Sequence, residues 1–221
     1  MAKPKDEAVS HRDDLKTPKS AAVAGIVFSL LMFTVFGLLR RSIPADPLES
    51  GAWLAADTRT IALALNLVPF AGVAFLWFVG VLRDRLGQQE DRFFATVFLG
   101  SALLYLVMLF AAAAVIGAVM FLASAAEPNE VISSSIFHYA RAAAYILNNV
   151  YATKMAAVFM ISTSTVVIYT SIAPRWIAYI GYLLALALLI GSYYIGWSFV
   201  ILPAWVLLIS TYILVDNLRR R

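Results

Sequence analysis

The chain alternates long apolar blocks with short polar segments, the pattern of a protein that crosses a membrane several times. Five blocks carry hardly any charge, namely residues 20–39, 61–82, 93–126, 155–174 and 177–215. A helix of about 20 apolar residues is long enough to span the hydrocarbon core of a bilayer. The last block is about twice that length and predicts two crossings, so the pattern predicts six transmembrane helices in all.

A more polar helical pattern precedes the fourth membrane helix, at residues 133–154. Polar and small side chains recur there at spacings of three and four, namely His138, Arg141, Tyr145, Asn148 and Ala152. This segment is too polar to span a membrane alone. It predicts either an interfacial amphipathic helix or a water-side extension of the fourth membrane helix. The expected fold class is therefore all-α: a polytopic bundle of about six membrane helices plus an outer-side amphipathic helix.

The polar ends of the chain flank a single hydrophobic domain. Residues 1–19 mix acidic and basic side chains with few apolar ones, which predicts a disordered cytoplasmic tail. Residues 20–216 are expected to form one transmembrane helical domain, followed by a basic cytoplasmic tail at residues 217–221. No small-residue cleavage pattern follows the first apolar block, so that block is expected to remain as the first membrane helix.

Composition supports lipid as the main partner of this chain. Of its 221 residues, 62% are hydrophobic and 14% are charged, whereas soluble domains are about half apolar and a quarter charged. The net charge of +4 is scattered over the polar segments without a basic stripe, so no nucleic-acid partner is expected. Cysteine is absent, which excludes disulfides and thiolate metal sites, and no metal or cofactor is expected.

The distribution of basic residues predicts which way the protein faces. Six crossings place both termini on one side, together with the loops after the second and fourth membrane helices. That side carries twelve Lys and Arg residues and the other side carries five. Because Lys and Arg resist translocation, the richer side is expected to be cytoplasmic. The predicted location is a cell membrane, with N- and C-termini in the cytoplasm.

In this topology, polar residues and prolines gather in the outer part of the membrane domain. The candidate polar cavity consists of Asn66, Pro69, Asn148, Asn149, Lys154 and Pro203. Each proline within a helix releases a backbone carbonyl that needs a partner, and a polar cavity open to the outside would supply one. The alternative is that Asn66 bonds a neighbouring helix, the prolines kink their helices, and Lys154 extends to the interface.

His138 and Arg141 form a candidate outer-surface contact. They would bind an anion or a lipid head group, or act as a proton-sensitive switch, because histidine titrates near neutral pH. The alternative is that both are ordinary surface residues.

No enzyme motif accompanies these residues. The sequence lacks a His-Glu-x-x-His zinc motif, a Gly-x-Ser-x-Gly nucleophile turn and a phosphate-binding loop. No acidic residue is predicted at mid-membrane depth, where proton-coupled transporters usually need one. The favoured function is therefore a non-enzymatic accessory or scaffold subunit, or a small-ligand or lipid-binding membrane subunit. A small channel or transporter with an outward-facing polar cavity is the alternative, and a lipid-modifying enzyme comes third.

Small-residue spacings bear on possible protein partners. Gly25-x-x-x-Ser29 and Ala113-x-x-x-Gly117 allow helix backbones to approach closely. Such pairs serve packing within one chain or self-association. A membrane-protein partner or a homo-oligomer is therefore compatible with the sequence.

One stretch carries a family resemblance. Residues 75–85, Phe-Leu-Trp-Phe-Val-Gly-Val-Leu-Arg-Asp-Arg, are followed by residues 90–100, Glu-Asp-Arg-Phe-Phe-Ala-Thr-Val-Phe-Leu-Gly. This pattern resembles uncharacterised multi-pass integral membrane proteins of actinobacteria. The resemblance implies a bacterial plasma membrane and a layout of roughly six helices, and it implies no activity or site residue.

Overall fold

The computed structural model describes residues 17–44, 57–86, 92–125, 131–132, 134–192 and 196–219. Every regular element in these ranges is helical. Most of the tail expected at residues 1–19, and the last two residues of the tail expected at 217–221, lie outside the described residues. The elements are α2 (Thr17–Ser42), α4 (Thr58–Leu86), α5 (Arg92–Ala125), α7 (Ser135–Ile146), η2 (Leu147–Ala152), α8 (Thr153–Thr170), α9 (Arg175–Gly191), η3 (Ser198–Val200) and α10 (Ile201–Arg219).

The lengths and hydropathy of these helices confirm a polytopic helical bundle. Five helical stretches are long and apolar enough to cross a membrane: Ser20–Ser42, Thr58–Arg83, Ala95–Ala125, Ser135–Thr170 and Ser198–Arg219. The sixth apolar helix, α9, is shorter, at 17 residues. Large apolar side chains cover the outside of the bundle, including Phe70, Trp77, Phe121 and Leu183, each more than 60% exposed. Such a surface matches lipid rather than water as the surrounding solvent.

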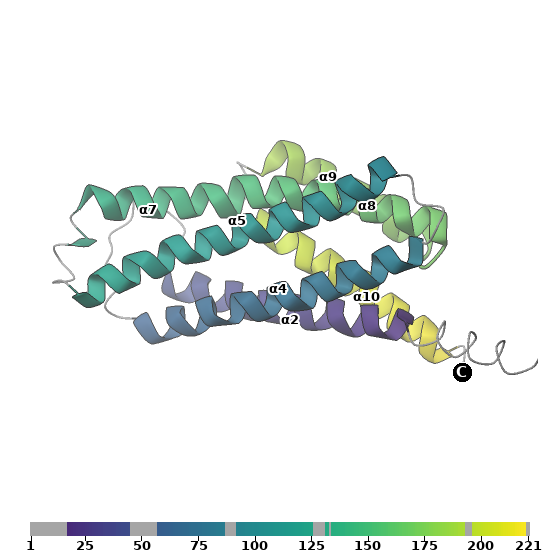
Figure 1. The fold of residues 1–221 in the computed structure, drawn as a ribbon, viewed down its shortest axis with the longest axis horizontal. Helices are drawn as coiled ribbons and strands as arrows, with labels where there is room; N and C mark the ends of the chain where they lie inside the picture. The colour runs from purple at the N-terminus through teal and green to yellow at the C-terminus, as the bar shows by residue number, and fades with distance from the viewer. Residues whose placement is uncertain are drawn as a thin grey trace, which may run out of the picture.

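The helices pass up and down through the bundle, so that α2 begins and α10 ends at the same end (Figure 1). α2 packs mainly against α4 and α10, and α8 packs mainly against α9. α5 packs against α8 along one part of its length and against α7 and η2 along another. The α9–α10 hairpin turns back near the middle of the bundle, while α5 and α7 continue past it (Figure 1).

The segment before the fourth membrane helix is continuous with it. α7, η2 and α8 form one helical stretch of 36 residues, Ser135–Thr170, so this segment continues directly into the fourth membrane helix and is not a separate helix. The inward face of α7 carries Phe137, Ala140, Arg141 and Ala144, whereas His138 is exposed and Ile136 and Tyr139 are 63% and 77% exposed. Arg141 is therefore a buried charge on a mostly apolar inward face.

An aromatic cluster fills the centre of the bundle. Phe75 of α4 contacts Phe28 of α2 in a tilted arrangement, with ring centroids 4.7 Å apart, and Phe159 of α8 edge to face, at 5.1 Å. Phe98 of α5 also contacts Phe159, at 5.2 Å. Aromatic pairs at these distances add stabilisation beyond the area they bury. They join α2, α4, α5 and α8 into one packed unit.

Gly181 lets α9 approach α8 and α10 closely. A side-chain carbon at this position would collide with the Ser164 hydroxyl and the Trp205 ring. Trp205 is 1% exposed and donates its indole N–H to the Ile177 carbonyl at 3.4 Å, so its ring has little freedom to move. The close approach of α9 to α8 and α10 therefore requires a residue without a side chain at position 181.

Gly181→Ala is expected to lower the free energy of unfolding by about 1–3 kcal/mol, the usual cost of overpacking a filled core. The measurement is the thermal unfolding midpoint of the purified protein in mild detergent. Gly80→Ala is the matched control, because a side-chain carbon at Gly80 meets nothing within 4 Å. Equal midpoints for the two variants would contradict the close packing at Gly181.

Candidate functional site

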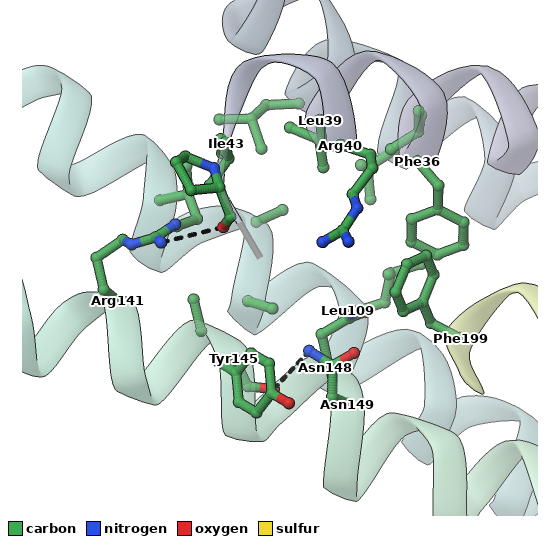
Figure 2. A pocket seen from close by; sticks show the side chains of 18 of the residues that line it. Phe36, Leu39, Arg40, Ile43, Leu109, Arg141, Tyr145, Asn148, Asn149 and Phe199 are labelled. Atoms are coloured by element: carbon green, nitrogen blue, oxygen red, sulfur yellow. Dashed lines mark hydrogen bonds between the residues drawn. The ribbon is translucent and has the colours of Figure 1, made fainter. Parts of the chain in front are cut away.

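A cavity of about 250 Å³ lies between α2, α4, α5, α7 and η2, beside the α9–α10 turn. Its polar lining consists of Arg40, Arg141, Tyr145, Asn148 and Asn149. Its apolar lining includes Val35, Phe36, Leu39, Val68, Leu109, Ile116 and Phe199. Figure 2 shows how the labelled side chains surround the empty space.

The short α9–α10 hairpin explains why the cavity exists. Gly196 and Phe199, from the end of this hairpin, line the cavity, and the described parts of α9 and α10 do not extend alongside α5 and α7 beyond that level (Figure 1). The main apolar core lies on one side. On the other side, a smaller cluster forms around Ile61, Val119 and Phe137. The cavity and its polar side chains occupy the region where these two clusters meet.

Arg141 lies inside the bundle, with 6% of its surface exposed. Its Nη2 donates a hydrogen bond to the Pro44 carbonyl oxygen, at 3.2 Å, and so links α7 to the chain just after α2. The Ser134 hydroxyl accepts a hydrogen bond from the Phe137 backbone N–H at 3.2 Å and so caps the start of α7, about two helical turns before Arg141. The cap and the hydrogen bond to Pro44 together fix the position of the guanidinium at the cavity wall.

Arg40 supplies a second positive charge from the opposite wall. It is an exposed residue in the last turn of α2, and its guanidinium is directed into the cavity, toward the side on which Tyr145 and Asn148 lie (Figure 2). Its neighbour Arg41 is also exposed but does not line the cavity. None of the described residues that line the cavity is acidic. The described lining therefore carries two positive charges and no negative charge.

Asn149 lies within η2, a π-helical segment that joins α7 to α8. It is 7% exposed, and its Nδ2 donates to the Tyr145 carbonyl at 3.1 Å. Its Oδ1 is buried and has no hydrogen-bond partner among the described residues. The Thr153 hydroxyl donates to the Asn149 and Val150 carbonyls, at 2.6 and 3.0 Å, and thereby satisfies carbonyls in the irregular segment. Single π turns inside α-helices are frequently found at functional sites.

The structure brings together two members of the predicted polar cavity, Asn148 and Asn149. Asn66 is exposed, and its Nδ2 donates to the Ala62 carbonyl of its own helix at 2.8 Å. Pro69 is also exposed on α4. Pro203 is buried at the third position of α10, where a missing backbone N–H costs little. None of these three residues is among those lining the cavity.

Lys154 has a different role from the one expected. Its Nζ donates to the Leu189 carbonyl of α9 at 2.9 Å. That carbonyl belongs to the last turn of α9, where backbone acceptors lack partners within the helix and a positive charge is favourable. Lys154 therefore caps α9 and does not line the cavity.

His138 and Arg141 do not form the expected joint surface contact. His138 is exposed, whereas Arg141 is buried and lines the cavity. The expectation of a surface position is wrong for Arg141, because the face of α7 that carries it packs toward α5 and the end of α2 rather than toward solvent.

Sequence reasoning missed Arg40 as a site residue. In the sequence, Arg40 and Arg41 are equivalent basic residues at the end of an apolar block. Only the direction of each side chain relative to α7 and η2 distinguishes them. One signal was available, because Arg41 lies about 100° around the helix from Arg40, so the two cannot both face inward.

The described residues contain no group of three His, Cys, Asp or Glu side chains that would hold a metal ion. The described lining offers charge, hydrogen bonds and apolar contact. No protein-family model, no curated protein and no solved structure matches this chain.

Proposed function

We propose that this chain is a non-enzymatic membrane protein that binds a small anionic amphiphile in the cavity. The observation that carries the proposal is the meeting of two arginines and two asparagines in a cavity whose remaining wall is apolar. A guanidinium presents several N–H donors in a fork that matches carboxylate and phosphate groups. The apolar wall matches the hydrocarbon part of the same ligand.

Burial makes the charge at Arg141 informative. Arg141 lies inside the bundle and lines the cavity, and charge interactions strengthen where water is excluded. An anionic group placed between Arg141 and Arg40 would interact with both guanidinium groups at once.

The size of the cavity indicates which part of the ligand it holds. Pockets that enclose a whole small ligand usually measure about 300–1,000 Å³, and this cavity is smaller, at about 250 Å³. It suits a head group and the first carbons of a chain. Because Arg40 is exposed, the cavity opens beside it, and the rest of the chain would run along the apolar surface of the bundle.

The proposed orientation follows from the distribution of basic residues. With both termini in the cytoplasm, the cavity lies in the half of the bundle away from them, near the outer leaflet. An amphiphile would then enter from that leaflet or from the outer surface. The resemblance to bacterial membrane proteins is in keeping with a plasma membrane.

Transport is the alternative proposal, and it requires a polar path that continues through the bundle. Beyond the cavity lie the packed rings of Phe28, Phe75 and Phe159, so the described core favours binding over passage. A lipid-modifying enzyme would need an activated nucleophile or an acid–base pair beside the cavity, and the described lining contains neither. An accessory subunit remains compatible with binding, since a bound lipid can mediate contact with a partner.

Arg40→Gln is expected to weaken binding of an anionic amphiphile by about tenfold or more, since hydrogen bonds to charged groups contribute about 1.5–3 kcal/mol. The measurement is titration of the protein in neutral detergent with a short-chain anionic phospholipid, followed by intrinsic tryptophan fluorescence or native mass spectrometry. Arg41→Gln removes the same charge from the adjacent residue and is expected to bind as the wild type does. Equal weakening by both variants would indicate a general surface-charge effect and would contradict the proposed site.

A further inference from the structure

Asn149 presents a buried acceptor that its own helix leaves unused. Its Nδ2 bonds the Tyr145 carbonyl, and a carbonyl accepts a hydrogen bond only from the nitrogen of the amide. That bond therefore fixes which way the amide faces. The amide oxygen, Oδ1, is then the atom left without a hydrogen bond. It is buried and has no partner among the described residues, and the Asn149 side chain lines the cavity.

Buried polar atoms without a partner are uncommon in folded proteins and indicate a missing water, ion or ligand. Oδ1 is a buried acceptor on a side chain of the cavity lining, and the same lining includes the donors of Arg40 and Arg141. An anion by itself would contact the arginines but would offer Oδ1 no donor. A ligand that fits the whole lining must also bring a hydrogen-bond donor.

We infer that the cavity selects an anionic amphiphile whose head group also carries a hydroxyl, of the glycerol phosphodiester type. This inference rests on the proposed function. The phosphate would face Arg40 and Arg141, and the hydroxyl would donate to Asn149 Oδ1. An ammonium group would also donate, but it would approach two guanidinium groups of the same charge, which disfavours a zwitterionic head group.

The same glycerol phosphate chemistry occurs in a lipid head group and in a free phosphate ester. Phe36, Leu109 and Ile116 line the same cavity, and a free ester would leave these apolar side chains uncovered. The lining therefore favours the lipid, and an arm of the experiment separates the two sources.

The experiment compares three phospholipids with identical acyl chains: phosphatidylglycerol, phosphatidylmethanol and phosphatidylcholine. The first two carry the same single negative charge, and the glycerol head group has two hydroxyls and two carbons more than the methyl head group. Binding to the full chain is measured by titration in neutral detergent. The wild type is expected to bind phosphatidylglycerol about fivefold to tenfold more tightly than phosphatidylmethanol, the range for one hydrogen bond, and to bind phosphatidylcholine most weakly.

Asn149→Leu removes the acceptor with little change in size. It is expected to reduce the preference for phosphatidylglycerol over phosphatidylmethanol to less than about twofold, while phosphatidylmethanol still binds. Asn66→Leu is the matched control, because Asn66 makes the same hydrogen bond to the carbonyl four residues earlier but lies outside the cavity. It is expected to keep the wild-type preference. If Asn149→Leu fails to fold, the wild-type comparison of the two anionic lipids still decides the inference.

The outcomes distinguish failure of the hydroxyl selection from failure of the proposed function. Equal affinity of the wild type for phosphatidylglycerol and phosphatidylmethanol would overturn the hydroxyl selection, with water as the partner of Oδ1, and would leave the proposed function standing. No preference of either anionic lipid over phosphatidylcholine would overturn the proposed function itself. Free glycerol 3-phosphate that binds as tightly as the lipid would overturn the assignment to an amphiphile.

Discussion

Arg141→Met is expected to reduce the binding of anionic amphiphiles by at least 100-fold, on the order of 2.7 kcal/mol. Arg141 is the buried one of the two cavity arginines, with 6% of its surface exposed, and charge interactions strengthen where water is excluded. Its loss would therefore weaken binding more than the loss of exposed Arg40. The measurement is the same lipid titration used for the Arg40 variant.

The same substitution also removes the hydrogen bond that links α7 to the Pro44 carbonyl. Loss of a charged donor leaves that carbonyl with one fewer partner, at a cost of about 1–3 kcal/mol. Methionine recovers part of this cost, because it no longer requires a charge to be buried. The net loss of stability is therefore expected to be small compared with the loss of binding. Hydrogen exchange at residues 40–43 would report the loosening of the end of α2.

Two further variants show whether Arg141 contributes to binding through its charge or through the geometry of its guanidinium. Arg141→Lys keeps the charge but replaces a planar fork by a single ammonium, so it is expected to bind more weakly than wild type and more tightly than Arg141→Met. His138→Gln changes an exposed residue three positions earlier on the same helix and is expected to leave binding unchanged. Wild-type affinity in Arg141→Met would remove this residue from the binding site.

The membrane architecture was predictable because its cause is local in the sequence. Each apolar block is long enough to span a bilayer, so block length alone gives the number and approximate limits of the long helices. The placement of Arg141, Asn148 and Ala152 on one helix face also follows from local spacing, since residues three and four apart share a face. What spacing does not give is whether that face points into the bundle or toward its surroundings.

The composition of the site depends on contacts between distant segments. Arg40 meets Arg141 across a cavity because α9 and α10 turn back before reaching that level (Figure 1). The last apolar block, read by length alone, predicts two crossings and not an early turn. Asn66 looked like a cavity residue because of its depth in the membrane helix, but depth does not determine the direction of a side chain. Lys154 likewise donates a hydrogen bond to a distant segment, at the carbonyl of Leu189, which lies 35 residues away in the sequence.

Ala144→Phe is expected to abolish binding while leaving the fold intact. Ala144 is 7% exposed and lines the cavity from α7, so a phenyl ring at this position would occupy the space proposed for the ligand. Adding bulk to a filled core usually costs about 1–3 kcal/mol. Because this position faces an existing cavity, the free energy of unfolding is expected to change by less than that. Lipid titration and the thermal unfolding midpoint would be measured on the same preparation.

Ala142→Phe is the matched control for this variant. Residue 142 lies two positions earlier on α7, about 200° around the helix, and is not among the lining residues. It is expected to bind anionic lipid as the wild type does. Wild-type affinity in Ala144→Phe would show that the ligand binds elsewhere on the protein.

Arg141→Met and Ala144→Phe are also expected to differ in which amphiphiles, neutral or anionic, they fail to bind. Arg141→Met removes the attraction for a charge but leaves the cavity open, so a neutral amphiphile of the same chain length is expected to bind it as weakly as it binds the wild type. Ala144→Phe removes the space itself and is expected to exclude neutral and anionic amphiphiles alike. If both variants lost only anionic ligands, charge would be the cause in each case, and the cavity would not be the place where the hydrocarbon part of the ligand is held.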